Sequence, residues 1–439
     1  MSYLLKGGII ATFTAGADKP QCYKSDILVE DSTIIQIAEN INAGPGVEVI
    51  DCEGKWISPG MIDTHRRHIQ SALTADEIHI GQLAGCLDAL HSGVTTLLDH
   101  FHAATTPEHA NKCLEATIKS GARVVWCPAR QSGPTQVFPT VEWANDAEAA
   151  KWQMEMLREL GTKDGGKLTA DGRVTLGLAY DLVGAGPVSI HQAALEFARE
   201  IPVALITAHV VKGPRILTFR DAGLLGPDIV FSHCNCLFER TDPDDEMWEA
   251  MKEHGCAIAS TPVDELGMAH GRPVAMEAVR RGVKCGLGAD CLSINGGRTH
   301  EDIDKQGLVL PRNNKHHSAD AFRLATLGGA EALNMQDIIG SIEVGKKADL
   351  VVFDTDSVNL AGINDPISGI TFHATNADVE LVMVNGEIVK RDHKLTKVEW
   401  GPVGRELKQK AAEVRERFPS ERLEALWSKW YDSNGAPVI

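Results

Sequence analysis

The sequence predicts an α/β protein with a (β/α)8 TIM barrel and a small β-sandwich domain formed by the N- and C-terminal segments. The middle of the chain alternates short apolar strands with helical stretches. Eight such units over roughly 280 residues are the repeat number and length of a (β/α)8 barrel. Short β-rich runs stand on both sides of this middle part. We therefore expect a barrel over residues 57–340 and a composite sandwich over 1–56 and 341–395.

The β-rich runs at the two ends of the chain are bounded by turn signals. In the downstream block, Asn385-Gly386 stands between VELVMV and EIVKR, and this dipeptide is a strong two-residue hairpin signal. The runs cover residues 7–13, 25–38 and 46–57 at the start and residues 340–354 and 379–395 downstream. Two such blocks flanking a long middle indicate that the ends of the chain meet in one small domain.

The middle part contains eight apolar runs with helical stretches between them. A doubly wound open sheet is the alternative, but no Gly-x-Gly-x-x-Gly follows the first strand, which disfavours it. After Lys394 the chain becomes polar, with Leu407, Ala411 and Val414 at helical spacing, and this predicts an amphipathic helical tail over 396–439. The expected strands are 58–65, 94–101, 122–129, 173–182, 203–209, 228–235, 255–262 and 283–290, and expected helices include 107–120, 145–160, 188–200, 244–255 and 272–282.

The composition is ordinary for a soluble globular protein. Of the 439 residues, 43% are hydrophobic and 23% are charged, so a sizeable core can be buried. The formal net charge of −17 argues against nucleic-acid and anionic-membrane partners, which need clustered Lys and Arg. No stretch approaches the roughly eighteen apolar residues of a membrane span, and the first residues lack the features of a signal peptide. We therefore expect a cytoplasmic protein without a membrane partner, and its ten scattered cysteines indicate reduced thiols.

Polar residues stand where the expected barrel strands end. The C-terminal ends of barrel strands build the active site in this fold, so these residues are expected to converge. Several histidines and one aspartate suit a divalent metal held by imidazole nitrogens and a carboxylate. The residues are His65, His100, His102, His209, His233 and Asp290.

Six motifs along the chain resemble one known family. They are PGMIDTH (59–65), SGVTTLLD (92–99), FSHCN (231–235), GLGAD (286–290), LATLGGAEALN (324–334) and GSIEVGKKADLVVFD (340–354). Together they resemble the amidohydrolase superfamily, in the branch of triazine hydrolases and of cytosine, guanine and S-adenosylhomocysteine deaminases. The resemblance implies a barrel whose metal, zinc or iron, activates water for attack on a C–N or C–Cl bond of a small, often heterocyclic substrate. It also favours a homodimer or larger homo-oligomer.

The resemblance implies a role for each strand-end residue. His65, His209 and His233 match ligand positions, and His233 also matches the group that polarises the substrate. Asp290 matches the residue that contacts the metal and accepts a proton from water. The strand over 173–182 has no lysine that could be carboxylated, so the resemblance implies one metal ion rather than two.

Two positions depart from the family pattern, and both carry a cation. Arg67 stands where the second histidine of the first strand is expected, and a guanidinium has no lone pair for a metal. Lys212 stands three residues after His209, where the family has a glutamate that moves protons between water and the leaving group. Glu265 is a candidate replacement for that glutamate.

These departures leave three arrangements open. His68 can replace the lost ligand if the strand end kinks, or Arg67 can turn away while the other ligands hold the metal with help from His100 or His102. His68, His100 and His102 are also candidates for substrate binding. In the third arrangement the pocket holds no metal, and Arg67 and Lys212 supply the positive charge.

Three functions remain open, because the first two arrangements keep the metal and the third does without it. Our leading prediction is hydrolysis of a C–N or related bond in a small anionic or heterocyclic compound by metal-activated water. The first alternative is a metal-free or non-hydrolytic lyase, isomerase or cyclase in which His209, His233 and Asp290 move protons. The second alternative is an inactive small-molecule binding protein.

Overall fold

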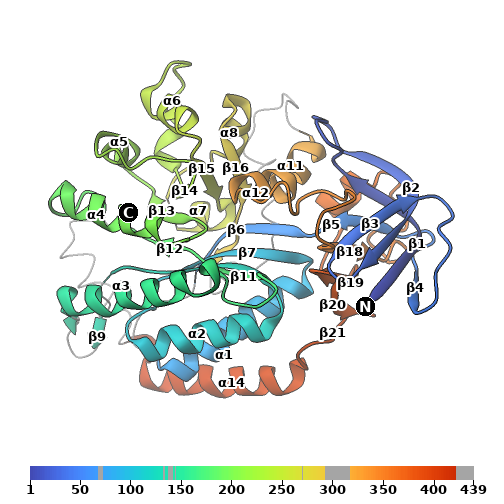
Figure 1. Cartoon of the computed structure of the whole chain (residues 1–439), viewed down its shortest axis with the longest axis horizontal. Helices are drawn as coiled ribbons and strands as arrows, with labels where there is room; N and C mark the ends of the chain where they lie inside the picture. Colours follow the sequence, from blue (N-terminus) through green and yellow to red (C-terminus); the bar gives the residue numbers. More distant parts are fainter. Residues whose placement is uncertain are drawn as a thin grey trace.

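The computed structural model describes residues 1–67, 73–131, 134–136, 142–143, 145–268, 270–291 and 317–421. Within these ranges, ten short parallel strands of the middle part form two five-stranded sheets (Figure 1). The first sheet has the order β11-β8-β7-β6-β17 and the second has the order β12-β13-β14-β15-β16. The strands are β6 (Met61–Arg67), β7 (Val94–Phe101), β8 (Arg123–Pro128), β11 (Val174–Leu176), β12 (Leu178–Ala179), β13 (Ile206–Val210), β14 (Ile229–His233), β15 (Ala257–Ser260), β16 (Lys284–Leu287) and β17 (Asp290–Cys291).

Each of the eight expected apolar runs contains one or two of these strands, and two runs belong to both sheets. The run over 173–182 provides β11 to the first sheet and β12 to the second, and the run over 283–290 provides β16 and the start of β17 in the same way. The hydrogen-bond ladders therefore divide into two sheets, and no single closed ladder is present among the described residues.

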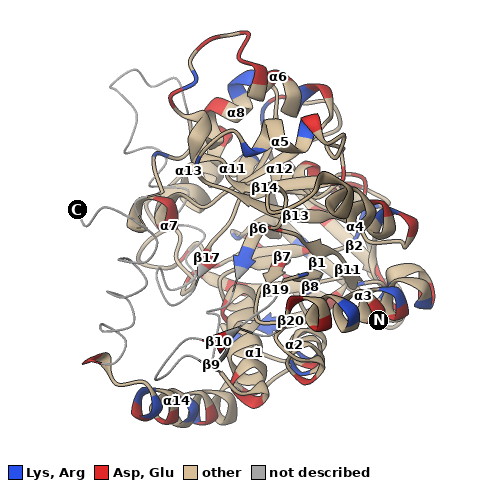
Figure 2. Ribbon diagram, turned by 90° about the vertical axis from the view of Figure 1, so that its left-hand side faces the viewer, with Lys and Arg blue, Asp and Glu red and all other residues tan. Residues whose placement is uncertain are grey.

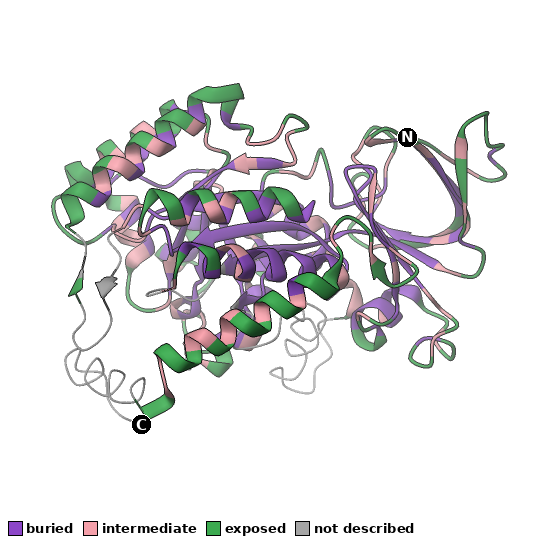
Figure 3. Ribbon diagram, turned by 90° about the horizontal axis from the view of Figure 1, so that it is seen from below, coloured by how far each residue is buried: buried purple, intermediate pink, exposed green. Residues whose placement is uncertain are grey.

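Helices cover the outer faces of these sheets, and the strands between them are buried (Figure 3). Their ends follow ordinary capping chemistry. Thr74 and Glu77 form a capping box at the start of α1, and α2 begins with Pro107 and ends at Gly121, whose φ of 85° suits glycine. The helices are α1 (Ala75–His91), α2 (Pro107–Ser120), α3 (Asp146–Thr162), α4 (Val188–Glu200), α5 (Arg215–Asp221), α6 (Glu246–Glu253), α7 (Pro262–Gly267), α8 (Ala275–Arg281), α11 (Ser318–Ala325), α12 (Leu327–Ala332), α13 (Pro366–Ser368) and α14 (Trp400–Arg417).

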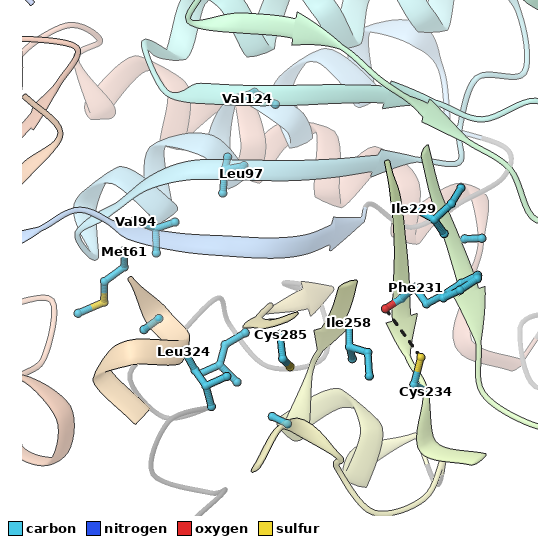
Figure 4. Packing of buried hydrophobic residues seen from close by; sticks show 14 of the residues in the cluster. Met61, Val94, Leu97, Val124, Ile229, Phe231, Cys234, Ile258, Cys285 and Leu324 are labelled. Carbon is cyan, nitrogen blue, oxygen red and sulfur yellow. Dashed lines mark hydrogen bonds between the residues drawn. The ribbon is translucent and has the colours of Figure 1, made fainter. Parts of the chain in front are cut away.

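The largest hydrophobic cluster joins both sheets to the helices around them. Figure 4 shows part of it, with Leu97 from β7, Phe231 from β14, Ile258 from β15 and Leu324 from α11. Burial of each such side chain contributes roughly 1.5–3 kcal/mol, so the cluster gives the strand ends a rigid support.

The two ends of the chain meet in one nine-stranded sheet, beside the parallel sheets in Figure 1. Its order is β21-β20-β19-β18-β5-β1-β2-β3, with β4 paired to β1. The expected hairpin is present, because Asn385 and Gly386 have φ values of 54° and 77° and join β19 to β20. A two-layer sandwich remains a prediction. The strands are β1 (Ser2–Thr12), β2 (Gln21–Glu30), β3 (Thr33–Ala38), β4 (Val47–Asp51), β5 (Trp56–Pro59), β18 (Leu350–Phe353), β19 (Val379–Val384), β20 (Glu387–Arg391) and β21 (Lys394–Leu395); β9 (Pro134–Gln136) and β10 (Glu142–Trp143) pair separately.

A buried ion pair joins β8 to the nine-stranded sheet. Arg123 donates from Nε and Nη2 to the two carboxylate oxygens of Asp349, both at 2.8 Å. We expect Arg123→Met to lower the free energy of unfolding by about 3–5 kcal/mol, because it leaves a buried carboxylate without its cation. Urea unfolding measures this loss. Arg220→Met, which removes an exposed pair with Asp221 and Glu246, is the control and should cost less than about 1 kcal/mol; equal losses in the two variants would contradict the prediction.

The helix α14 lies along α1, where Val403 packs against Ile80 and Leu83. Its exposed turns carry charges of both signs (Figure 2), and Arg417 at its end pairs with Glu77. Within the part of the chain that the structure describes, no helix has the length and apolar character needed to cross a bilayer.

Candidate active site

Four predicted residues converge at the carboxyl ends of the parallel strands. His65 lies in β6, His209 in β13, His233 at the end of β14 and Asp290 at the start of β17. The side chains of His65, His233 and Asp290 have no exposed surface, and that of His209 is 15% exposed. One ligand atom from each of the three histidines lies within 4.8 Å of the others.

In each of these rings Nδ1 has a hydrogen-bond partner. His65 Nδ1 lies 2.8 Å from Ser232 Oγ, His233 Nδ1 lies 2.8 Å from Thr261 Oγ1, and His209 Nδ1 lies 2.9 Å from Asp181 Oδ2. These contacts orient the rings and leave Nε2 as the atom facing the site. Metal-binding histidines in proteins are commonly oriented in this way, by a hydrogen bond to the other ring nitrogen. Nε2 of His209 and Nε2 of His233 make no hydrogen bond to any described residue.

Asp290 lies between two of the rings. Its Oδ1 is 3.7 Å from His65 Nε2 and its Oδ2 is 3.9 Å from His233 Nε2. Both His233 and Asp290 have left-handed backbones, with φ values of 73° and 48°. Non-glycine residues rarely adopt this conformation, and where they do they often serve a site. The backbones also approach closely, because a side chain at Gly288 would lie 2.7 Å from the carbonyl oxygen of His65.

A bulge in β6 sets the direction of the side chains next to His65. Between the pairs Asp63–Leu97 and Arg66–Asp99, β6 has one residue more than β7. Asp63 accepts hydrogen bonds from Arg66 Nε at 2.8 Å, from the backbone N–H of His65 at 3.2 Å and from that of Ala289 at 3.1 Å. Asp63 therefore fixes His65 and the segment before Asp290 together.

Arg67, the first departure from the family pattern, is described by the structure only for its backbone. Arg67 is the last residue of β6, and its backbone pairs with that of Cys291 in β17. The side chain of Arg67 and the whole of His68 lie outside the described residues. The neighbouring Arg66 points away from the site, since it pairs with Asp63 and donates to the carbonyl of Gly85.

A second group of polar side chains surrounds Asp181, which follows β12. Asp181 Oδ2 lies 3.2 Å from His100 Nε2, 3.2 Å from His102 Nε2 and 2.9 Å from His209 Nδ1. Burial alone would raise the pKa of Asp181, but the facing His209 and His100 rings outweigh it and hold the pKa well below its ordinary value. Burial lowers the pKa of His209 well below its ordinary value, although Asp181 acts in the opposite direction.

Glu265 and Lys212 occupy different surroundings. Glu265 is fully buried at α7, where its carboxylate accepts hydrogen bonds from Ser260, from the backbone of Thr261 and from Asn235. It faces Nδ1 of His233 at 3.8 Å, whereas Asp290 faces the other nitrogen of that ring. Lys212 is exposed on the rim of a hollow of about 480 Å³ beside His209.

A model of the amidohydrolase family matches residues 56–389. The chain belongs to this family. The amidohydrolase is 26% identical to a 5-methylthioadenosine/S-adenosylhomocysteine deaminase of Thermococcus onnurineus, over 90% of this chain and 95% of the relative. It is 24% identical to a 5'-deoxyadenosine deaminase of Methanobrevibacter smithii, over 90% and 94% of the two chains.

Solved structures with low sequence identity share its fold. An adenosine deaminase of Xanthomonas campestris with bound zinc superposes on the amidohydrolase with a TM-score of 0.79 at 16% identity, over 94% of this chain and 98% of the other. An atrazine chlorohydrolase of Arthrobacter aurescens in complex with zinc gives a TM-score of 0.79 at 18% identity, over 93% and 99%.

Family membership makes the chain a hydrolase that acts on carbon–nitrogen bonds other than peptide bonds. Its described residues fit the zinc that the solved relatives contain. Imidazoles with their outer nitrogens already bonded, together with a buried carboxylate, are a usual zinc ligand set. His65, His209, His233 and Asp290 supply such a set.

Sequence analysis missed several residues that shape this site. Asp181 had a recognisable signal, because it stands at the end of an apolar run like the residues that were selected. Ser232 and Thr261 had none, since each bonds to a histidine of another strand. Asp63 had none either, since its link to Ala289 joins segments 226 residues apart. His270 was also missed, and its ring lies against that of His233 with centroids 5.0 Å apart.

Proposed function

We propose that this amidohydrolase removes an amino group hydrolytically from a small heterocyclic substrate of the adenosine type. The observation that carries the proposal is the convergence of His65, His209 and His233 on one buried point beside Asp290. The similarity over most of the chain to deaminases of adenosine derivatives supports the substrate class.

We assign the roles from the contacts of each side chain. His65, His209, His233 and Asp290 hold the ion through the nitrogens and oxygens that face the site. A divalent zinc or iron ion held there supplies Lewis acidity, which makes water a better nucleophile at neutral pH. Asp290 accepts the proton of the attacking water and delivers it to the leaving nitrogen.

The remaining candidates receive supporting roles. Glu265 fixes the orientation of His233 from behind, because its carboxylate is bonded to the backbone of Thr261 and lies beside Nδ1. Lys212, at the rim of the hollow next to His209, binds an anionic part of the substrate. Arg67 and His68 contribute to substrate binding.

The functional alternatives lack comparable support. A lyase, isomerase or cyclase without a metal needs positively charged side chains where the metal ligands would stand. The site instead presents Nε2 of His209 and Nε2 of His233, which are suited to binding a metal. An inactive binding protein would not need the left-handed backbones that hold His233 and Asp290 in place.

Ammonia release tests the proposal. Zinc-loaded protein is expected to release ammonia from 5'-methylthioadenosine, S-adenosylhomocysteine, 5'-deoxyadenosine or adenosine, and chelator treatment should abolish the release until zinc is restored. Product formation is followed by the conversion of the adenine chromophore. No ammonia from any of the four compounds would reject the substrate class, and full activity of metal-free protein would reject the mechanism.

We also propose the architecture around the site. The two five-stranded sheets are halves of one (β/α)8 barrel over 57–340, since two runs belong to both sheets. Residues 1–56 and 341–395 form a separate sandwich domain, and 396–439 form a helical tail, of which 422–439 lie outside the described residues. A homodimer or larger assembly is the expected oligomeric state.

A further inference from the structure

The end of β7 supplies two histidines that the ligand set of His65, His209, His233 and Asp290 does not use. His100 is fully buried and His102 is 6% exposed. Both turn toward the carboxylate of Asp181, which follows β12 and also faces the ring of His209. Three strand ends therefore bring three imidazoles and one carboxylate to a single point.

Hydrogen bonds account for only part of this arrangement, because they join Asp181 Oδ2 to His102 Nε2 and to His209 Nδ1. Three ring nitrogens lie 2.9–3.2 Å from one oxygen, Asp181 Oδ2, whereas a carboxylate oxygen offers about two lone-pair directions. His100 Nε2 is the excess nitrogen. It is buried and makes no hydrogen bond to any residue of the described chain, although it lies 3.2 Å from Oδ2. Its ring is held from the other side, where Nδ1 lies 3.4 Å from Thr207 Oγ1.

The spacing matches a metal-ligand shell. Tetrahedral zinc with bonds of about 2.0–2.1 Å holds its ligand atoms roughly 3.3–3.4 Å apart. One ligand atom from each of His100, His102, Asp181 and His209 lies within 4.8 Å of the others, and the contacts to Asp181 are close to the tetrahedral value. Imidazole nitrogens with one carboxylate oxygen favour zinc and similar first-row ions over magnesium or calcium.

We propose that His100, His102, Asp181 and His209 form a second metal site for a divalent, zinc-like ion. His209 uses Nδ1 in this second site and Nε2 in the first, so one imidazolate bridges two ions. When the second ion binds, the Nδ1 proton of His209 is released to solvent. The absence of a lysine over 173–182 predicted one metal; Asp181 at the end of the same run provides a different carboxylate for a second one.

Metal titration of the unmodified protein tests the second site directly. Chelated protein is titrated with Zn²⁺ or Co²⁺ and the bound metal is counted by elemental analysis after gel filtration. The expected end point is two equivalents per chain, with a proton released to a pH indicator during the second. Saturation at one equivalent would overturn the proposal, and no variant that fails to fold can confuse this result.

Variants then separate the two sites. His102→Gln and His100→Gln should each bind one equivalent and His233→Gln should also bind one, while His254→Gln, altered outside both groups, should bind two. Two equivalents in the His100 and His102 variants would overturn the second site. If the unmodified protein binds one ion, loss of that ion in His233→Gln alone supports the first site and rejects the second. Loss of binding in His102→Gln but not in His233→Gln would instead reject the ligand set of the proposed function.

Discussion

Replacement of His209 with Ala is expected to deprive the protein of bound metal and of turnover. His209 belongs to both groups of potential ligands, and its Nδ1 contact with Asp181 fixes the direction of Nε2. Removing a group that only hydrogen-bonds to a metal ligand lowers metal affinity or activity about 10–100-fold. Removing the ligand itself should therefore lower both by more than roughly 100-fold. Elemental analysis of dialysed protein and steady-state assays measure the two effects.

His254→Ala is the matched control, because His254 contacts the backbone of Ala250 on α6 and neither ligand group. It should keep the metal content and turnover of the unmodified protein. Circular dichroism and the unfolding midpoint show whether His209→Ala is folded. A folded variant with full metal content and turnover would refute the assignment of His209.

Asp290→Asn should lower kcat by about 100- to 10,000-fold, the range associated with loss of a general base. The amide keeps the shape of the carboxylate between His65 and His233, so the effect falls on proton transfer and on metal binding rather than on packing. The acid limb of the pH profile of kcat/KM should also change, because that limb reports the base of the free enzyme.

Asp356→Asn, which alters an exposed carboxylate after β18, is the control and should leave the pH profile unchanged. An Asp290→Asn enzyme with an unchanged profile and more than one-tenth of the original kcat would show that another group accepts the proton. Glu265, behind His233, would then be the first residue to examine.

The secondary structure of this chain could largely be read from local patterns. Apolar runs of strand length predicted all the parallel strands, and Asn385-Gly386 predicted the hairpin between β19 and β20. The division into two ladders could not be predicted, because it depends on which strands pair with each other along the chain. Strand pairing between distant segments leaves little trace in a single sequence.

The candidate site was predictable where residue type and strand position coincide. His65, His209, His233 and Asp290 satisfy both conditions. Asp181 satisfies them too, but the family pattern drew attention to a missing lysine rather than to the aspartate present. The groups that bond to Nδ1 could not be predicted, since Ser232 lies 167 residues from His65.

The position of β5 in the nine-stranded sheet has a consequence for synthesis. β5 (Trp56–Pro59) lies between β1 and β18, and its antiparallel partner β18 (Leu350–Phe353) is made about 290 residues later. At 5–20 residues per second, roughly 15–60 s pass before that partner leaves the ribosome. During this time an apolar strand edge is open to other chains. The nine-stranded sheet is therefore completed only after the parallel-stranded middle of the chain has been made.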